Sequence, residues 1–235
     1  MKGGDISQNL QRLGGYLLVP FAIILAVFAW RYFTAEPDWN ILALQAAATH
    51  DRLIVVLAKN TTAKLWAYEK KEGVWAEYLH ASGFVGRNGI SSDKREGDGT
   101  TPAGLYSLRR AFGNAEDPGS HLPYQKLKPD DFWVDDPASR YYNTMVKGDV
   151  LDRDWSSAEE LSAETIAYKY AVVIEYNTDS VTKGAGSAIF LHCDQGRPTA
   201  GCVSVPEEVM IRLLRFIHSG DGIIIASSAR ELIRH

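Results

Sequence analysis

The sequence HCDQGRPTAGCV occupies residues 192–203 and joins two apolar parts of the chain. The run AIFL at 188–191 precedes it and is typical of a buried strand, and Pro206 follows where a helix can begin. A short polar loop therefore carries one histidine, two glycines and two cysteines between two buried elements. Since such elements hold a loop rigidly, we expect the rest of the fold to support this one.

The residue types in this loop indicate nucleophilic catalysis by a thiol. His192 ends a predicted strand and can act as the base that a thiol needs. Gly201 permits close backbone approach and leaves the N–H groups of Gly201 and Cys202 uncovered, as an oxyanion requires. A helix that follows closely favours a lowered pKa of the Cys202 thiol. We expect a backbone carbonyl to orient His192, and acyl transfer to proceed through a thioester.

Three other interpretations of the loop stay open. Cys193 and Cys202 could form a disulfide, although a strand would point Cys193 away from the face of His192. His192, Cys193, Cys202 and His218 could bind zinc, although their spacing matches no common ligand pattern. Cys202 could also be an inert buried thiol. We interpret Cys193 itself as a small core residue.

Strands dominate the remainder of the chain, so we predict a mostly β protein, a sandwich or barrel. One helix is expected from Pro206, with apolar residues on one face, and it ends at Gly220. Shorter helices are expected over 37–50, capped by Asp38, and at 156–161, where the Ser-x-x-Glu spacing occurs. A hairpin turn is expected at 71–73. The predicted strands cover 53–57, 63–68, 74–79, 171–176, 187–191 and 222–226, with another entered at 105–106.

Two long segments lack a regular period. Residues 83–104 are rich in glycine and predict a long folded loop. Residues 113–157 form an insert that is either a lid or binding surface, or an ordinary surface elaboration.

The N-terminal segment is apolar. Residues 13–30 hold no charge, and Tyr32 and Phe33 extend the stretch to about the length that crosses a bilayer. Lys2 and Arg12 before it favour an inside N-terminus and an outside catalytic domain. We expect a single-pass membrane anchor, with a cleaved signal peptide and a buried core helix as alternatives.

Charge and length limit the classes of function. The net charge is −4; since residues 1–34 contribute +2, the remainder carries −6, which gives no case for nucleic-acid binding. Two cysteines exclude a disulfide scaffold. The expected division is an anchor or signal peptide (1–34), a linker with a short helix (35–51), a catalytic domain (52–228) and a C-terminal tail (229–235).

Three motifs resemble those of one enzyme family. The run TAGCV at 199–203, preceded by His192, resembles the defining motif of the L,D-transpeptidase catalytic (YkuD-type) domain. GRNG at 86–89 and DGTTPAGLY at 98–106 are similar to that family's upstream loop and strand. The resemblance covers roughly 53–226 and implies a β-sandwich with one helix after the catalytic cysteine.

The resemblance also implies roles for residues. Cys202 aligns with the nucleophile, His192 with the base and Thr199 with a Ser/Thr position, and Gly201 precedes the nucleophile. The implied reaction takes the acyl group of a peptidoglycan stem tetrapeptide, releases D-alanine and passes the acyl group to a side-chain amine of a neighbouring stem, giving a 3→3 cross-link. No metal or organic cofactor is implied.

Two departures separate this chain from better-known members. His192 and Cys202 lie 10 positions apart, a shorter spacing, and Ser204 stands where an arginine is common. Arg197 or Arg87 could replace that arginine by pairing with a substrate carboxylate. An L,D-carboxypeptidase, which passes the thioester to water, and a non-catalytic cell-wall-binding domain are the alternative functions.

Overall fold

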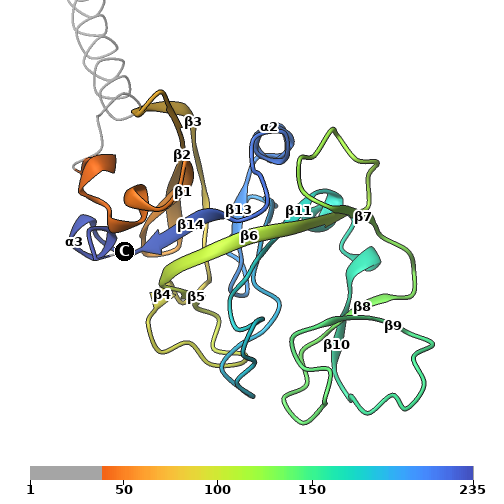
Figure 1. Cartoon of the computed structure of the whole chain (residues 1–235). Coiled ribbons are helices and arrows are strands. Elements are labelled where there is room, and N and C mark those ends of the chain that lie inside the picture. The colour runs from red at the N-terminus through yellow and green to blue at the C-terminus, as the bar shows by residue number, and fades with distance from the viewer. Residues whose placement is uncertain (1–38, 235) are drawn as a thin grey trace, which may run out of the picture. The chain divides into compact units, whose positions relative to one another are not determined.

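The computed structural model describes residues 39–234, and its main feature is a sheet that closes on itself (Figure 1). The order of its nine strands is β11-β12-β13-β3-β2-β1-β14-β6-β7, and β11 also pairs with β6. The first eight strands in this order therefore form a closed barrel, with β7 attached to β6. The strands are β1 (Arg52–Lys59), β2 (Thr62–Lys71), β3 (Val74–Phe84), β6 (Gly104–Gly113), β7 (Tyr124–Lys126), β11 (Ala171–Ile174), β12 (Phe190–Cys193), β13 (Val203–Val205) and β14 (Asp221–Ala226).

The mostly β prediction is confirmed. The strand pattern left a sandwich or a barrel open, and the strands form one closed sheet, whereas the family resemblance implied a sandwich. β11 is buried along its whole length and pairs with β12 on one side and β6 on the other. A buried apolar run has the same sequence character in both architectures, so its second neighbour could not be predicted. The β2–β3 hairpin turns at Glu72 and Gly73, both at positive φ, as expected.

Successive side chains of β12 point to opposite faces of the sheet and belong to two different clusters of buried residues. Leu191 and Cys193 lie in the barrel core, together with residues of helix α2 (Glu207–Leu214). Phe190 lies in a second cluster outside the barrel, with Cys202, Trp133 and others. The predicted helix after Pro206 is confirmed as α2, with Pro206 as its N-cap and Glu207 and Glu208 in its first turn. Its predicted end at Gly220 is wrong, because α2 ends at Leu214 with Arg215 as its C-cap. Apolar residues of α2 cover the barrel core, as its pattern predicted.

The predicted insert, which the structure extends to residue 160, folds into a small sheet of its own beside β7 and β11 (Figure 1). Its order is β10-β8-β9, with bounds β8 (Asp131–Val134), β9 (Met145–Lys147) and β10 (Ala158–Glu160). The helix predicted at 156–161 is wrong, because Ser156 bonds through its N–H and its hydroxyl to Asp136 and β10 pairs with β8. Two 3₁₀ turns, η3 (Leu161–Ala163) and η4 (Ala167–Lys169), lead back to β11.

Asn143 joins this insert to the segment before β12. Its Oδ1 accepts hydrogen bonds from Trp133 Nε1 at 2.9 Å and from the Ala188 N–H at 3.1 Å. Its Nδ2 donates to the carbonyls of Tyr176 and Asn177. The side chain is 2% exposed, so all four of these bonds are shielded from water. The insert is thereby fixed to the barrel at a point close in sequence to the histidine loop.

The ends of the described chain differ from the simple predictions. Residues 37–50 were expected as one helix capped by Asp38, but 3₁₀ turns η1 (Ile41–Ala43) and η2 (Gln45–Ala48) occur there, and Asn40 caps the first. Asp38 and the predicted anchor within 1–34 lie outside the described residues. Between 39 and 234 no helix is long and apolar enough to cross a membrane. A short helix, α3 (Ala229–Leu232), occupies part of the segment expected as a tail.

The glycine-rich segment is a folded loop, as predicted, and contains the two-residue parallel strands β4 (Ile90–Ser91) and β5 (Thr101–Pro102). At its start, β3 meets β13 through a single register pair, Phe84 with Ser204. A Cβ atom placed on Gly83 would lie 1.8 Å from the Ser204 carbonyl oxygen. Glycine is therefore required where the barrel closes beside the candidate site.

We predict that Gly83→Ala lowers the free energy of unfolding by about 2–4 kcal/mol, because a backbone carbonyl cannot yield to the added methyl group without separating β3 from β13. Urea denaturation measures the change. Ser82→Ala is the matched control, since Ser82 is exposed on the same strand, and it should change the value by less than about 0.5 kcal/mol. Equal stability of Gly83→Ala and wild type would contradict the close packing at this seam.

Candidate active site

All six site residues predicted from the sequence border one cavity of about 710 Å³. They are Arg87, His192, Arg197, Thr199, Gly201 and Cys202. The barrel supplies one wall of this cavity, and the insert and the η3–η4 segment supply the other. The insert therefore contributes to the site through Asp135 and is not only a surface elaboration.

Hydroxyl groups hold the backbone of the cysteine in place. Thr199 Oγ1 donates to the Cys202 carbonyl at 2.6 Å, and Thr101 Oγ1 donates to the same oxygen at 3.3 Å. The backbone of Thr199 is also bonded to the segment just after β3. Its N–H donates to the Val85 carbonyl, and its carbonyl accepts from the Arg87 N–H. The loop is thus fixed to the barrel on both sides of the cysteine, and Thr199 has a clear structural role.

Gly201 allows the close approach that was predicted, but its N–H is not free. An added Cβ would lie 3.0 Å from the Thr100 carbonyl oxygen, so a larger residue would press on the backbone. The Gly201 N–H donates to Thr199 Oγ1 at 3.1 Å. The expectation that both N–H groups are uncovered is therefore wrong for Gly201, and the Cys202 N–H is the better candidate donor for an oxyanion.

Cys202 is a neutral thiol at the cavity floor. Its Sγ accepts a hydrogen bond from the Phe190 N–H and donates to the Ala188 carbonyl, both at 3.3 Å. Burial, together with the charge of Glu159, raises the pKa of Cys202 to about 12. The lowered pKa expected from a following helix is wrong, because α2 begins only at Glu207, after β13.

The imidazole of His192 is oriented by a backbone carbonyl, as expected. His192 Nδ1 lies 2.8 Å from the Cys193 carbonyl oxygen. A carbonyl can only accept, so Nδ1 carries the proton and Nε2 has its lone pair free to act as a base. Burial lowers the pKa of His192. The ring packs edge-on against Tyr168, with centroids 5.6 Å apart, which further fixes its plane.

The disulfide and zinc alternatives do not match this geometry. Cys193 and Cys202 are both free thiols and belong to different clusters on opposite faces of β12. His218 stacks on His121, with ring centroids 4.5 Å apart. In residues 39–234 no group of three or more His, Cys, Asp or Glu residues is placed to hold a metal ion.

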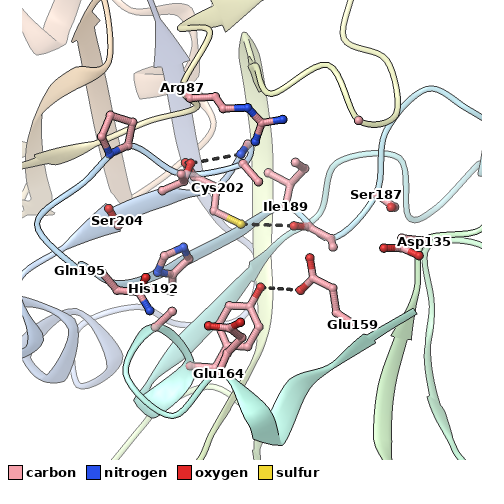
Figure 2. A pocket seen from close by; sticks show the side chains of 18 of the residues that line it. Arg87, Asp135, Glu159, Glu164, Ser187, Ile189, His192, Gln195, Cys202 and Ser204 are labelled. Atoms are coloured by element: carbon pink, nitrogen blue, oxygen red, sulfur yellow. Dashed lines mark hydrogen bonds between the residues drawn. The ribbon is translucent and has the colours of Figure 1, made fainter. Parts of the chain in front are cut away.

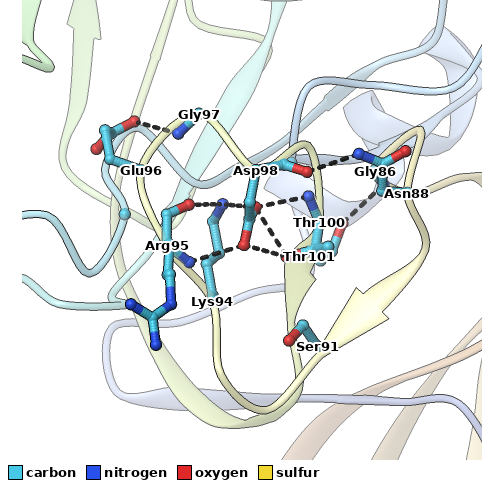
Figure 3. Close-up of polar contacts among 12 residues, drawn as sticks. Gly86, Asn88, Ser91, Lys94, Arg95, Glu96, Gly97, Asp98, Thr100 and Thr101 are labelled. Carbon is cyan, nitrogen blue, oxygen red and sulfur yellow. Dashed lines mark hydrogen bonds and ion pairs between the residues drawn. The ribbon is translucent and has the colours of Figure 1, made fainter.

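Lys94 is a buried cation in the cavity wall that the sequence interpretation missed. Its side chain is 4% exposed, and its Nζ donates to Asp98 Oδ1 at 2.9 Å and to the Arg95 carbonyl (Figure 3). Although burial opposes ionisation, hydrogen bonds from Thr100, Arg95 and Lys94 lower the pKa of Asp98 to about 2. The positive charge of Lys94 acts to lower the pKa of Cys202.

Glu159 is a second missed residue, and it lies on β10, on the insert side of the cavity. Its Oε2 accepts a hydrogen bond from Tyr168 at 2.6 Å (Figure 2). Burial raises the pKa of Glu159 to about 7 against the lowering effect of the Tyr168 hydroxyl, and nearby carboxylates add to the rise. In the view of Figure 2, the Cys202 sulfur lies between the His192 ring and this carboxylate.

The two arginines that were proposed to replace the missing family arginine are both exposed at the cavity rim. Arg197 donates to the Gln195 side chain through Nε and Nη2. Arg87 and the carboxylates of Glu159 and Glu164 lie on opposite sides of Cys202 in Figure 2. Ser204 is 1% exposed, and its hydroxyl has no hydrogen-bond partner among the described residues.

The missed residues left little signal in the sequence. Lys94 stands among charged residues in a glycine-rich loop, and only the following Asp98 at helical spacing hinted at a pair. Glu159 looked like a capping residue of a helix that does not form. Both are carried to the site by segments whose path depends on long-range pairing.

Comparison with known proteins supports one family. The model of the YkuD family, described as L,D-transpeptidase catalytic domain, matches residues 51–225. No curated protein matches the chain significantly. A solved structure described as Bdellovibrio bacteriovorus Bd1075 is similar at 17% identity with a TM-score of 0.43; the match covers 81% of this chain and 55% of that one. The chain thus spans about half the length of that protein. With three quarters of its length matched by the family model, the chain belongs to the L,D-transpeptidase catalytic domain (YkuD) family.

Proposed function

We propose that this protein is a cysteine acyltransferase that forms 3→3 cross-links between peptidoglycan stem peptides. The observation that carries the proposal is that Cys202 and a neutral histidine border one cavity. Nδ1 of His192 is committed to a carbonyl, and Nε2 is left as the base. The cavity of about 710 Å³ lies in the size range of sites for small ligands.

The first half-reaction acylates the cysteine. The substrate carbonyl before the terminal D-residue approaches Sγ, and His192 Nε2 takes the thiol proton as the C–S bond forms. The resulting imidazolium then gives this proton to the leaving amine as the C–N bond breaks. Because burial favours neutral forms of both groups, charge separation arises only during the reaction and requires stabilisation nearby.

Two groups can stabilise the negative charge that develops. The Cys202 N–H is held at the site by the two threonine hydroxyls that bind the carbonyl of the same residue. Lys94, with a side chain that is 4% exposed and held by Asp98, supplies a fixed positive charge in the wall. Preorganised donors and charges of this kind are the largest single contribution in many acyl-transfer enzymes.

We also propose that residues 1–34 hold the catalytic domain at the outer face of a membrane, where stem peptides occur. The uncharged run at 13–30 and the basic residues before it support this arrangement. Loss of the protein from the membrane fraction on deletion of 1–34 would be consistent with it.

We predict that the purified protein acts on stem peptides only when Cys202 is present. Mass spectrometry of muropeptides after incubation should reveal a dimeric product, and a carbapenem should leave an adduct on the Cys202 peptide. Cys202→Ala should abolish both, whereas Cys193→Ala, in the barrel core, should retain them. The acid limb of acylation should have its midpoint below 6.5, the ordinary value for histidine, because burial lowers the pKa of His192.

Other products would change the assignment. A shortened monomer without a dimer would indicate the L,D-carboxypeptidase. Absence of both product and adduct would remove the enzymatic function and leave a wall-binding domain.

Lys94→Met should raise the pKa of the Cys202 thiol, since the variant removes the positive charge that acts to lower it. Iodoacetamide alkylation of the Cys202 peptide, followed from pH 6 to 10, should be several-fold slower at each pH. Arg95→Met is the matched control, because Arg95 is an exposed cation of the same loop. An unchanged alkylation profile in Lys94→Met would exclude an electrostatic effect on the nucleophile.

Arg87→Ala and Arg197→Ala should each raise the KM for a stem tetrapeptide by about twofold to fivefold and leave kcat nearly unchanged. Both guanidinium groups are exposed, so a bound carboxylate would gain only the energy of a solvent-screened pair. Steady-state kinetics separates the two constants. If neither variant changes KM, the arginines do not take over the role of the absent family arginine.

A further inference from the structure

We propose that Glu159 receives the acceptor amine: its carboxylate binds the incoming ammonium group and takes its first proton. This role rests on the proposed transpeptidase function and concerns only its second half-reaction. It would make the insert, which supplies β10, a catalytic part of the enzyme and not only a wall.

The chemical need arises from the acceptor. An alkyl ammonium of the lysine type has an ordinary pKa of about 10.4, so nearly all of it is protonated and non-nucleophilic at pH 7. His192 handles one proton in each half-reaction, but an ammonium must lose two protons to become an amide nitrogen. A second proton acceptor is therefore needed on the path by which the amine reaches the thioester.

Glu159 occupies a suitable place. Tyr168 lies between it and the base: the Tyr168 hydroxyl bonds Glu159 Oε2, while the Tyr168 ring packs against His192. The negative charge of Glu159 acts to raise the pKa of the Cys202 thiol. Of the two carboxylate oxygens of Glu159, only Oε2 has a hydrogen-bond partner among the described residues. Because Glu159 and Tyr168 both line the cavity, Oε1 of Glu159 is available to a ligand.

Other carboxylates of the wall are less suitable. Glu96 accepts from the hydroxyls of Tyr142 and Ser187 and is committed to the loop. Glu164 is exposed, beyond η3. Glu159 is partly buried, and its Oε2 is held by Tyr168, whose ring packs against His192. A pKa of about 7 also suits a group that must bind a cation and then hold its proton near neutral pH.

During transfer, the acceptor nitrogen loses two protons to two different groups. The acceptor R–NH3⁺ gives one proton to Glu159, and its nitrogen lone pair attacks the thioester carbon, forming the C–N bond. His192 Nε2 takes the second proton from nitrogen. The C–S bond breaks with its electron pair moving to sulfur, and the imidazolium returns its proton to give the Cys202 thiol. Glu159 then releases its proton to solvent.

The groups that face Glu159 come from several segments and set its titration. They are Tyr168 of η4, Asp135 after β8, Glu164 after η3 and Glu96 of the glycine-rich loop. Cys202 also interacts electrostatically with Glu159. The carboxylates raise the pKa of Glu159, and the Tyr168 hydroxyl lowers it. Tyr168→Phe should therefore move the rising limb of amine transfer to higher pH.

The test separates acylation from transfer in the full-length protein. Wild type, Glu159→Gln and Glu160→Gln are acylated with a stem tetrapeptide, and transfer to Nα-acetyl-lysine is followed by mass spectrometry. Hydroxylamine serves as a second acceptor, since it is already neutral at pH 7 and needs no first deprotonation. Release of D-alanine measures acylation on its own.

Glu159→Gln should slow transfer to Nα-acetyl-lysine on the order of a hundredfold, the range for loss of an acid–base group, and leave acylation and transfer to hydroxylamine within about twofold of wild type. Glu160→Gln removes a neighbouring charge from the same cavity and should change neither transfer. Equal losses with both acceptors would show a general defect and overturn the role. The role would also be overturned if Glu159→Gln transferred the acyl group to Nα-acetyl-lysine at the wild-type rate. An unchanged rising pH limb of amine transfer in Tyr168→Phe would overturn it as well. Absence of D-alanine release in wild type would instead contradict the proposed function itself.

Discussion

The placement of Cys202, the proposed nucleophile, depends on how β13 is held between β12, to which it is parallel, and β3, to which it is antiparallel. On one side it runs parallel to β12, so that the histidine strand and the cysteine segment share a register. On the other it meets β3 through one register pair, with Gly83 against the Ser204 carbonyl. Since the chain before β13 is a loop, these contacts, together with the threonine hydroxyls on the Cys202 carbonyl, decide where the sulfur lies.

This construction has an electrostatic consequence. Burial of the Cys202 thiol, together with the charge of Glu159, favours its neutral form and raises its pKa to about 12. The charge of Lys94 is kept nearby by Asp98, whose own ionisation is secured by the hydrogen bonds of its loop. The site therefore holds Cys202 as an uncharged thiol, with the cation of Lys94 already placed in the cavity wall. Such an arrangement protects a thiol from oxidation, because the thiolate is the reactive form.

The local part of the fold was predictable from the sequence. The period of two along 190–193 predicted that His192 and Cys193 face opposite sides, and Pro206 with two glutamates predicted the start of α2. The β2–β3 turn followed from a glycine between alternating strands. These features depend on neighbouring residues only, which is why pattern and propensity were sufficient.

The remainder depended on contacts between distant segments. β11 has a second neighbour because it pairs with β6, which lies far away in the sequence. Ser156 bonds to Asp136 instead of capping a helix because the fold of the insert brings Asp136 close to it. Glu159 and Lys94 reach the cavity by the same long-range routes. The pKa of Cys202 was misjudged for a related reason: three strand residues separate it from the helix whose dipole was invoked.

Asn143 links the insert sheet to the segment that precedes β12. Its Oδ1 accepts a hydrogen bond from the Ala188 N–H, and the Ala188 carbonyl accepts one from the Cys202 thiol. The same Oδ1 holds Trp133 of the insert sheet. Barrel and insert are therefore not separable modules: a transplanted barrel would lack the amide that holds Ala188, the residue whose carbonyl binds the Cys202 thiol. Variation in the insert is expected to concentrate at its outer loops and to spare this amide.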